Sequence, residues 1–372
     1  MSSRRPRIID ADGHVMEPAG MWERYIDPAY RDRAPRVVRG PDGRTGIESG
    51  GRLSPRFECV STAMRAAFAA RVRERLGASL QADYSAESQL RAMDEGGIEI
   101  AFLYPTQGLY VAAIDDLDPG LGIAICRAYN DWLLDFCALA PERLRPVGML
   151  VALHDPAAAV AEARRLAARD VRAVFVRPNP IRGRNLDDPA YAPLWAECER
   201  LGLAVGVHEG VGAWVPEAGA DRFRSFFACH AAAHPMEQML AVLTLIGGGV
   251  LERHPQLRVA FLESGCGWLP YWLWRLDEHW EQTDGIAGEP RLPMRPSEYF
   301  RRQCWISCEP DEPYIPRVLD LIGEDRLLFA SDYPHPDHKW PETAEAMLAL
   351  PIPDAVRTKV LWDNPAAFYG LA

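Results

Sequence analysis

Residues 8–18 read IIDADGHVMEP and place three polar side chains within an otherwise apolar run. Asp10, Asp12 and His14 are two residues apart, so on a β-strand they lie on one face. We expect a strand over Arg7–Gly13, with Asp12 and His14 at its carboxyl end as a candidate metal-binding pair. Asp10 lies a layer deeper, where a buried hydrogen-bonding role is expected.

Short apolar segments rich in β-branched residues alternate with amphipathic helical patterns along the chain. This alternation indicates parallel strands joined by helical crossovers, and the polar residues at strand ends favour a (β/α)8 TIM barrel over a doubly wound sheet. Expected helices include Ser85–Glu95, Pro156–Arg169, Pro189–Leu201 and Pro353–Trp362. The expected strands are Arg7–Gly13, Ile98–Tyr104, Pro146–Val151, Arg172–Arg177, Leu203–His208, Leu257–Glu263, Gln303–Cys308 and Arg326–Ser331.

Three connections are longer than ordinary loops of an α/β barrel. Met21–Asp83 contains a polar stretch, expected to form a hairpin or an irregular excursion, and then a basic helix. Gly210–Gln238 follows the fifth strand, and a tryptophan-rich segment follows the sixth. We therefore expect one domain over residues 1–372, with an insertion at about 21–83 and long loops after strands 1, 5 and 6.

The composition excludes several classes of protein. A formal net charge of −11 and a pI of about 5.4 argue against nucleic-acid and anionic-membrane partners. No apolar run is long enough for a membrane span, and the N-terminal residues lack the apolar region of a secretory signal. The eight cysteines lack C-x-x-C spacing, which favours buried unpaired thiols over disulfides. We expect a cytoplasmic protein that acts on a small molecule.

Charged or hydrogen-bonding side chains end several of the expected strands. In a barrel, the carboxyl ends of the strands meet at one face and supply the active site. Each side chain alone has a structural explanation, such as a turn, a helix cap or a salt bridge. Unpaired charges gathered at a barrel mouth of low dielectric are costly, however, and a divalent cation gives them a common purpose. The residues are Asp12, His14, Arg177, Asn179, His208, Glu263 and Asp332.

The motifs that carry these residues resemble those of the amidohydrolase superfamily. They are DADGH at residues 10–14, VGVHEG at 205–210, ESGCGWLPYW at 263–272 and ASDYPHPD at 330–337. Within the superfamily, the chain is most similar to the amidohydrolase-2 group, typified by aminocarboxymuconate semialdehyde decarboxylase. The resemblance covers nearly the whole chain and implies a metal-dependent TIM-barrel enzyme, but it does not define the reaction.

The resemblance implies a metal ion held by Asp12, His14, His208 and Asp332. Asp12 stands where the family usually has histidine, and Glu263 stands where it commonly has a catalytic histidine. As a further ligand, Glu263 would give a carboxylate-rich site for one or two divalent transition-metal ions, with iron or manganese favoured and zinc possible. A mononuclear site, in which Glu263 only orients a water or a histidine, stays open.

Two weaker candidates lie outside this set. Glu17 is a possible further ligand, although Pro18 after it is also typical of a helix start. His230 and His234 have the spacing of neighbours on one helix face. Pro235 is nevertheless expected to begin the helix and to leave both histidines in the preceding loop. His234 is a candidate general acid or substrate contact.

Four residues are candidate substrate contacts. Arg177 could hold a substrate carboxylate, with Asn179 beside it; a salt bridge below the barrel mouth is the alternative. His335 follows Asp332 in a proline-interrupted loop and is expected at the rim. Trp268 begins the tryptophan-rich segment, which forms either a substrate wall or a packed interface of a homo-oligomer, most simply a dimer.

Two reactions fit this site, and the sequence favours hydrolysis. A metal-activated water would attack an activated ester, thioester or amide of a small organic or aromatic acid, and Asp332 would take the proton. The alternative is non-oxidative decarboxylation of an aromatic or unsaturated carboxylic acid. The missing strand-six histidine weakens that alternative, because Glu263 is short of protons at neutral pH unless burial raises its pKa.

Overall fold

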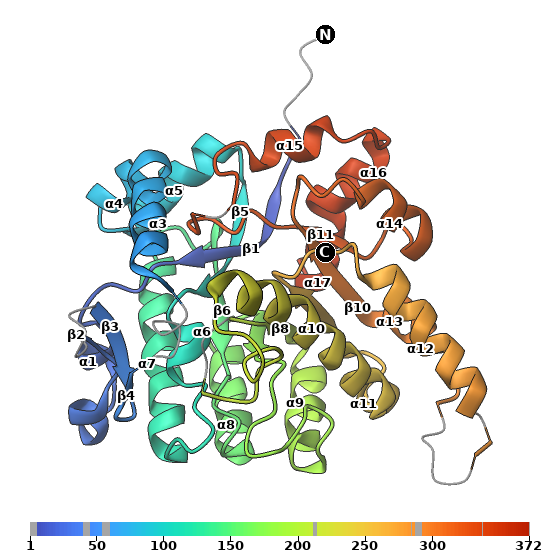
Figure 1. Ribbon diagram of the computed structural model, residues 1–372, viewed down its shortest axis with the longest axis horizontal. Coiled ribbons are helices and arrows are strands. Elements are labelled where there is room, and N and C mark those ends of the chain that lie inside the picture. Colours follow the sequence, from blue (N-terminus) through green and yellow to red (C-terminus); the bar gives the residue numbers. More distant parts are fainter. Residues whose placement is uncertain are drawn as a thin grey trace.

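Eight parallel β-strands form the centre of the molecule, and helices surround them (Figure 1). The computed structural model describes residues 6–39, 45–53, 60–210, 214–283, 285–286, 292–336 and 338–371. The strands follow the chain order around the sheet, which confirms the (β/α)8 barrel. They are β1 (Ile9–Val15), β5 (Ile100–Pro105), β6 (Leu144–Met149), β7 (Ala173–Val176), β8 (Ala204–His208), β9 (Val259–Leu262), β10 (Cys304–Cys308) and β11 (Leu327–Phe329).

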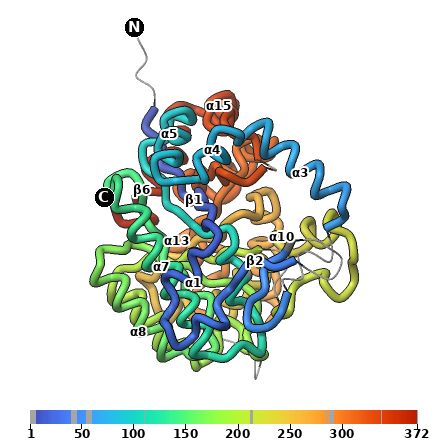
Figure 2. The backbone as a smooth tube through the Cα atoms, turned by 90° about the vertical axis from the view of Figure 1, so that its left-hand side faces the viewer, coloured from blue at the N-terminus to red at the C-terminus, as the bar shows by residue number. Residues whose placement is uncertain are grey.

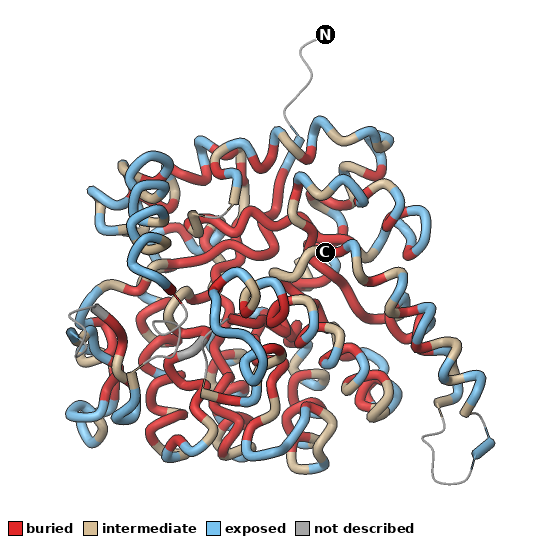
Figure 3. The backbone as a smooth tube through the Cα atoms, in the orientation of Figure 1, coloured by how far each residue is buried: buried red, intermediate tan, exposed pale blue. Residues whose placement is uncertain are grey.

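The strand positions follow from burial on both faces of the barrel wall. Parallel strands covered by helices outside and by side chains inside read as continuous apolar runs. β7 (AVFV) and β9 (VAFL) are such runs, and every residue in them is buried. Figure 3 shows the buried residues concentrated on these central strands. All eight expected strands are present, with ends shifted by at most two residues.

Backbone hydrogen bonds close the barrel between β1 and the segment after β11. The Asp332 amide donates to the Asp12 carbonyl oxygen at 3.0 Å, and the His14 amide donates to the Tyr333 carbonyl oxygen at 2.7 Å. These bonds place residues from the two ends of the chain side by side at the barrel mouth. The first metal-binding candidates are thus fixed next to Asp332 by the fold itself.

Asp10 ties the same two strands together one layer deeper. Its carboxylate accepts hydrogen bonds from the Ser331 amide at 2.9 Å and from the Ser331 hydroxyl at 2.5 Å. A Cβ atom at Gly13 would lie 2.8 Å from Asp10 Oδ2, so the β1 bulge between Asp10 and Gly13 requires glycine there. The buried hydrogen-bonding role expected for Asp10 is confirmed.

The remaining helices cover the outside of the barrel and its rims. The helices after the strands begin at side-chain caps where the sequence offers them, as Ser85 shows for α5 by accepting from the Ser88 amide. They are α5 (Ala86–Gly96), α6 (Gly108–Val111), α7 (Pro119–Cys137), α8 (Pro156–Ala167), the 3₁₀ turn η2 (Pro189–Tyr191), α9 (Ala192–Leu201), α10 (Phe226–Gly247), α11 (Val250–Arg253), α12 (Leu269–Thr283), α13 (Pro296–Gln303), α14 (Ile315–Ile322), α15 (Thr343–Ala349), α16 (Asp354–Thr358), the π turn η3 (Lys359–Asp363) and α17 (Asn364–Tyr369).

The long connection after β1 carries its own small sheet. β2 (Arg36–Arg39), β3 (Thr45–Ser49) and β4 (Arg52–Leu53) pair antiparallel in chain order, so the polar stretch forms the expected hairpin, with β4 as a further strand. Figure 2 looks onto this side and shows β2 and α3 in front of the barrel. The described residues of this connection also include α1 (Met21–Tyr25), the 3₁₀ helix η1 (Pro28–Arg33), the basic helix α3 (Thr62–Arg75) and α4 (Gly77–Gln81).

The expectation that a helix begins at Pro235 is wrong. α10 begins at Phe226, where the Ser225 side chain caps it by accepting from the Ala228 amide, and Pro235 lies inside the helix. Proline inside a helix forfeits one backbone hydrogen bond, a loss that tertiary packing can offset. His230 and His234 therefore lie on α10 and not in a loop, and their rings stack with centroids 4.6 Å apart.

Two expectations from the composition can be compared with the structure: unpaired cysteines and the lack of a membrane span. The seven cysteines among the described residues are buried and unpaired, and Cys59 lies outside the described ranges. In the part of the chain that the structure describes, no helix is both long and apolar enough to cross a membrane.

Candidate metal centre

Five ionisable side chains meet at the carboxyl ends of four barrel strands, where barrel enzymes carry their active sites. Each comes from the end of a strand or from a residue shortly after it, and four of the five residues are almost fully buried. We call this group the barrel-mouth cluster. Its members are Asp12 and His14 of β1, His208 of β8, Glu263 after β9 and Asp332 after β11.

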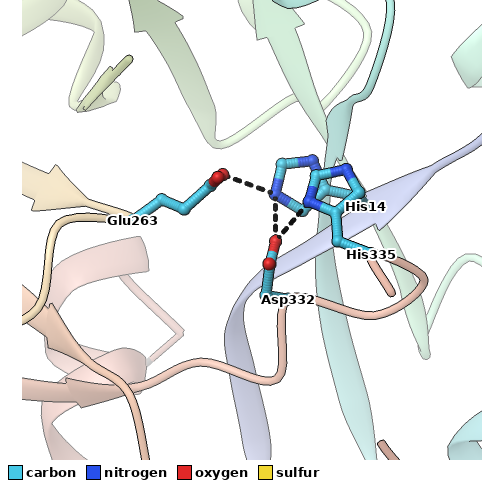
Figure 4. Close-up of side chains that lie close together, drawn as sticks. All are labelled: His14, Glu263, Asp332 and His335. Carbon is cyan, nitrogen blue, oxygen red and sulfur yellow. Dashed lines mark ion pairs between the residues drawn. The ribbon is translucent and has the colours of Figure 1, made fainter. Parts of the chain in front are cut away.

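The two histidines of the cluster face carboxylate oxygens through Nε2. His14 Nε2 lies 3.1 Å from Asp332 Oδ1, 3.5 Å from Glu263 Oε2 and 3.7 Å from Asp12 Oδ1. His208 Nε2 lies 3.1 Å from Glu263 Oε2 and 3.3 Å from Asp12 Oδ1. Figure 4 shows His14 with the side chains of Glu263 and Asp332 pointing toward it.

The other ring nitrogen of each histidine fixes its tautomer. His14 Nδ1 lies 2.8 Å from the Pro105 carbonyl oxygen, and His208 Nδ1 lies 2.7 Å from the Glu209 carbonyl oxygen. A carbonyl oxygen only accepts, so each Nδ1 carries the proton and donates it. In the neutral rings, both Nε2 lone pairs therefore point at carboxylate oxygens.

Two facing acceptors repel each other unless a positive charge lies between them. Among the described residues, both oxygens of Asp12 and Asp332, Glu263 Oε2 and the Nε2 atoms of His14 and His208 are buried and have no hydrogen bond of normal geometry. Buried polar atoms without partners are costly, and these seven atoms at one point call for a ligand. Imidazole and carboxylate donors suit a divalent transition metal, so the residues fit the metal that their motifs imply.

In the cation-free protein, protons take the place of that charge. Burial alone would lower the pKa of His208, but Asp12 and Glu263 raise it to about 9. Burial alone would raise the pKa of Asp332, but His335, His338 and His14 lower it well below its usual value. The cluster thus holds imidazolium rings against carboxylates until a cation replaces the protons.

The backbone is strained at two members of the cluster. Glu263 has φ 48° and Asp332 has φ 53°, in the left-handed region that disfavours residues with a Cβ. Each such residue costs about 1–3 kcal/mol and persists only where its surroundings hold it. The Ser307 hydroxyl accepts a hydrogen bond from the Glu263 amide at 3.0 Å and helps to hold this backbone conformation. Strain at both positions accords with a functional role for these two carboxylates.

His335 was expected at the rim of the barrel, but its ring also contacts Asp332 of the barrel-mouth cluster. Its Nδ1 is 2.7 Å from Asp332 Oδ1, and its ring centroid is 4.2 Å from that of His14. His338 Nε2 lies 2.6 Å from Asp332 Oδ2 on the other side. Among the described residues, two groups have ligand atoms close enough together to hold an ion. One group is His14, Glu263, Asp332 and His335, and the other is Asp12, His14 and His208. A role of His335 in substrate binding stays a prediction.

His234 reaches the cluster from α10. Its Nδ1 lies 2.7 Å from the Glu263 carbonyl oxygen, so Nδ1 carries a proton and donates it. Burial lowers the pKa of His234 to about 4, which keeps the ring neutral at neutral pH. The structure places His234 beside Glu263, and its predicted role as a general acid stays a prediction that this low pKa disfavours.

Arg177 is held in a buried network at the end of β7. Its Nη2 donates to Glu209 Oε1 at 2.7 Å and its Nε donates to Asn179 Oδ1 at 3.0 Å, while Nη1 donates to the Leu109 carbonyl oxygen. Arg177 and Glu209 are both at most 1 % exposed. The structure thus shows the salt bridge that was the alternative to a substrate clamp. Binding of substrate by Arg177 and Asn179 stays a prediction.

Glu17 and Trp268 lie outside the cluster. The Glu17 carboxylate accepts from the Gln107 amide at 2.9 Å and from the Gly108 amide at 2.8 Å, so its oxygens hold the turn after β5. Metal binding by Glu17 stays a prediction, and these contacts do not support it. Trp268 packs against the core, and its Nε1 is buried without a hydrogen bond among the described residues. Its role in substrate binding and the expected homo-oligomer stay predictions.

Sequence reasoning missed Thr106 altogether. Its hydroxyl lies 3.1 Å from His335 Nε2 and donates to the Val15 carbonyl oxygen at 2.9 Å. A signal was available, because Thr106 directly follows the strand that ends at Pro105 and so belongs to the barrel mouth. The sequence did not show that its partner would be a histidine 229 residues away.

Comparison with known proteins gives a family model and two relatives that match the chain. The family model described as amidohydrolase matches residues 9–371. A 2-amino-3-carboxymuconate-6-semialdehyde decarboxylase of Dictyostelium discoideum is 32% identical over 156 residues, which span 42% of each chain. A gamma-resorcylate decarboxylase of Rhodococcus jostii is 29% identical over 301 residues, covering 76% of this chain and 87% of the relative.

Solved structures share the fold. An amidohydrolase from Mycobacterium avium subsp. paratuberculosis superposes with a TM-score of 0.77 at 23% identity, covering 99% of this chain and 100% of the other. A dihydroxybenzoic acid decarboxylase from Polaromonas, solved with bound manganese and an inhibitor, superposes with a TM-score of 0.69 at 19% identity, covering 98% and 97%. At these identities the superpositions establish the fold alone.

Proposed function

The chain belongs to the amidohydrolase family, and from this premise we propose that it catalyses the metal-dependent, non-oxidative decarboxylation of an aromatic carboxylic acid. The observation that carries the proposal is the pair of Nε2 lone pairs that His14 and His208 direct at buried carboxylates. The names of the relatives support decarboxylation, since both are decarboxylases of carboxylic acids. These names favour decarboxylation, which was the alternative in the sequence analysis, over hydrolysis, which was its first choice.

We assign the metal to Asp12, His14, His208 and Asp332, with Glu263 as a further carboxylate. When bound, a divalent cation supplies a positive charge that holds substrate oxygens and stabilises developing negative charge. Manganese is supported by the Polaromonas decarboxylase, and iron or zinc also suits these donors.

The chain itself must deliver one proton. The bond between the ring carbon and the carboxylate carbon breaks, carbon dioxide leaves, and the electron pair on the ring carbon takes up a proton. We assign the transfer of that proton to Asp332 and His338 together: Asp332 is itself ionised, and the proton comes from the His338 imidazolium, whose Nε2 lies 2.6 Å from Asp332 Oδ2, and passes through Asp332 to the ring carbon. His234, with its pKa near 4, is neutral and suited to hydrogen bonding rather than to donating this proton.

Hydrolysis remains the second candidate because of one observation. Glu263 stands at the end of β9 and is ionised, since His14 and His208 lower its pKa well below the usual value against the effect of burial. A site rich in carboxylates and poor in acidic protons suits water activation, with Asp332 accepting the proton.

A substrate panel separates the two reactions. The manganese-loaded protein would be incubated with hydroxybenzoic acids, including gamma-resorcylate, and in parallel with aryl esters and thioesters. The proposal predicts release of carbon dioxide and of the matching arene in equal amounts. Acid release from the esters or thioesters, without carbon dioxide from any acid, would favour hydrolysis instead.

A further inference from the structure

The side-chain amide of Gln238 on α10 joins the carboxyl ends of two neighbouring barrel strands. Its Nε2 donates to the Val207 carbonyl oxygen of β8 at 2.8 Å and to the Leu262 carbonyl oxygen of β9 at 3.1 Å. Carbonyl oxygens only accept, so the nitrogen of the amide, and not its oxygen, must face both of them. The two N–H groups of one amide thus bridge the two strands.

Each of these carbonyl groups belongs to the peptide bond that leads into a member of the barrel-mouth cluster. Val207 directly precedes His208, and Leu262 directly precedes Glu263. The two side chains meet, with His208 Nε2 at 3.1 Å from Glu263 Oε2. The bridge therefore fixes the two peptide planes from which these side chains start, and with them the separation of two candidate ligands.

The backbone of Glu263 needs such support because its φ is 48°. Gln238 holds the carbonyl group before it, His234 Nδ1 donates to its own carbonyl oxygen at 2.7 Å, and Ser307 accepts from its amide at 3.0 Å. His234 and Gln238 are four residues apart, so α10 presents both on one face. Two side chains of this helix thus hold the end of β9 where it carries Glu263.

Packing alone does not explain a glutamine at this position. Gln238 is fully buried, and its Oε1 has no hydrogen bond among the described residues. A buried acceptor without a partner is unfavourable, and a methionine of similar volume would avoid it. The two hydrogen bonds to the strand ends are what the amide provides and a methionine could not.

A second glutamine makes the same kind of bridge at the opposite end of the barrel. Gln303 Nε2 donates to the His254 carbonyl oxygen at 2.7 Å and to the Leu257 carbonyl oxygen at 2.9 Å, and Gln303 is also buried. These two carbonyl groups lie just before β9, whereas Leu262 is its last residue. The two amides share their chemistry and burial, but only Gln238 adjoins the metal centre.

We propose that Gln238 is a positioning residue of the metal centre and sets the separation of His208 and Glu263 by bridging the ends of β8 and β9. It acts through the backbone of both residues. The inference rests on the metal assignment made for the proposed function and extends it to a residue outside the ligand set.

The test compares Gln238→Met with the matched control Gln303→Met in the full-length, metal-stripped protein. Isothermal titration should show that Gln238→Met raises the dissociation constant for Mn²⁺ about 10–100-fold, the usual effect of losing a group that orients a ligand. Gln303→Met loses the same two bonds and should lower the midpoint of urea unfolding, yet bind Mn²⁺ within about threefold of the wild type. Circular dichroism confirms the fold of both variants.

A smaller change decides the matter if Gln238→Met does not fold. Gln238→Asn keeps the amide, but its side chain is one methylene shorter and cannot span both carbonyl groups. It should raise the dissociation constant for Mn²⁺ by at least about threefold, within the lower part of the same range.

The outcomes separate this inference from the proposed function, since none of the readouts depends on turnover. Wild-type affinity in the folded Gln238 variant, or an equal loss of affinity in Gln303→Met, overturns the inference. Weaker Mn²⁺ binding in Gln238→Met alone, without carbon dioxide from any acid, would support it while overturning the proposed reaction. A wild type that binds no Mn²⁺ overturns both.

Discussion

Protons and metal ions compete for the same nitrogen atoms, so the affinity for Mn²⁺ must rise with pH. Burial alone would lower the pKa of His208, but Asp12 and Glu263 raise it to about 9. The pKa of His14 is likewise raised well above its usual value, since Asp332 and Glu263 outweigh burial. Both rings hold a proton on Nε2 up to high pH, and a cation must displace it.

The size of the effect follows from the pKa of His208. Displacing one proton from a group of pKa near 9 lowers the dissociation constant roughly 80-fold between pH 6.5 and pH 8.5, about 2.6 kcal/mol. A histidine with the ordinary pKa of about 6.5 would change it only about twofold over the same range. Release of the His14 proton adds to the fall, so 80-fold is the smaller expected value.

Isothermal titration of metal-free protein with Mn²⁺ at pH 6.5, 7.5 and 8.5 measures this dependence. Repeating each titration in two buffers of different ionisation enthalpy counts the protons released, and we expect at least one per chain at pH 6.5. His208→Gln should flatten the pH dependence and release about one proton fewer. A dissociation constant that varies less than threefold, or binding without net proton release, would refute the tautomer argument for the site.

Three further predictions concern single residues. Asp332→Asn should lower kcat by about 10²–10⁴-fold, the range for a lost proton-transfer group, with circular dichroism showing an intact fold; near-normal turnover would contradict its assigned role. Arg177→Met leaves Glu209 buried and unpaired and should lower the free energy of unfolding by about 3–5 kcal/mol, with Glu209→Gln restoring most of it. If that double variant is stable but has lost activity, the substrate role of Arg177 gains support instead. Burial raises the pKa of Glu309 to about 7, so the stability that its protonated form contributes is present at acid pH and is lost as pH rises through 7. In urea titrations of metal-free protein, Glu309→Gln should gain about 2 kcal/mol over wild type between pH 5 and pH 8, and a constant difference would refute this.

The barrel could be predicted because its strands are buried on both faces. Runs such as VFV at 174–176 indicate parallel strands covered on both faces, and the polar residues at their ends favour a barrel over a doubly wound sheet and mark its mouth. Asp12, His14, His208 and Asp332 were found by position at strand ends, which depends only on chain order. Glu263 was found in the same way, as a departure from the family motif.

The contacts that depend on loop geometry could not be predicted. His335 lies between two prolines and follows Asp332, which has a positive φ, and nothing in the sequence shows that its ring turns back onto Thr106. Arg177 was ambiguous because its partner Glu209 belongs to the next strand end, so only the register between β7 and β8 decides the pair. Pro235 was misleading because helix-start statistics do not include the packing that holds α10 together around it.

Direct measurement of carbon dioxide tests the central claim most simply. Metal-stripped protein, protein reloaded with Mn²⁺ and reloaded Asp332→Asn would each be given the hydroxybenzoic acid panel while carbon dioxide and arene are followed together. We predict equal release of both from at least one acid by the reloaded wild type alone. Equal activity in the metal-stripped protein, or hydrolysis of esters with no carbon dioxide from any acid, would contradict the account.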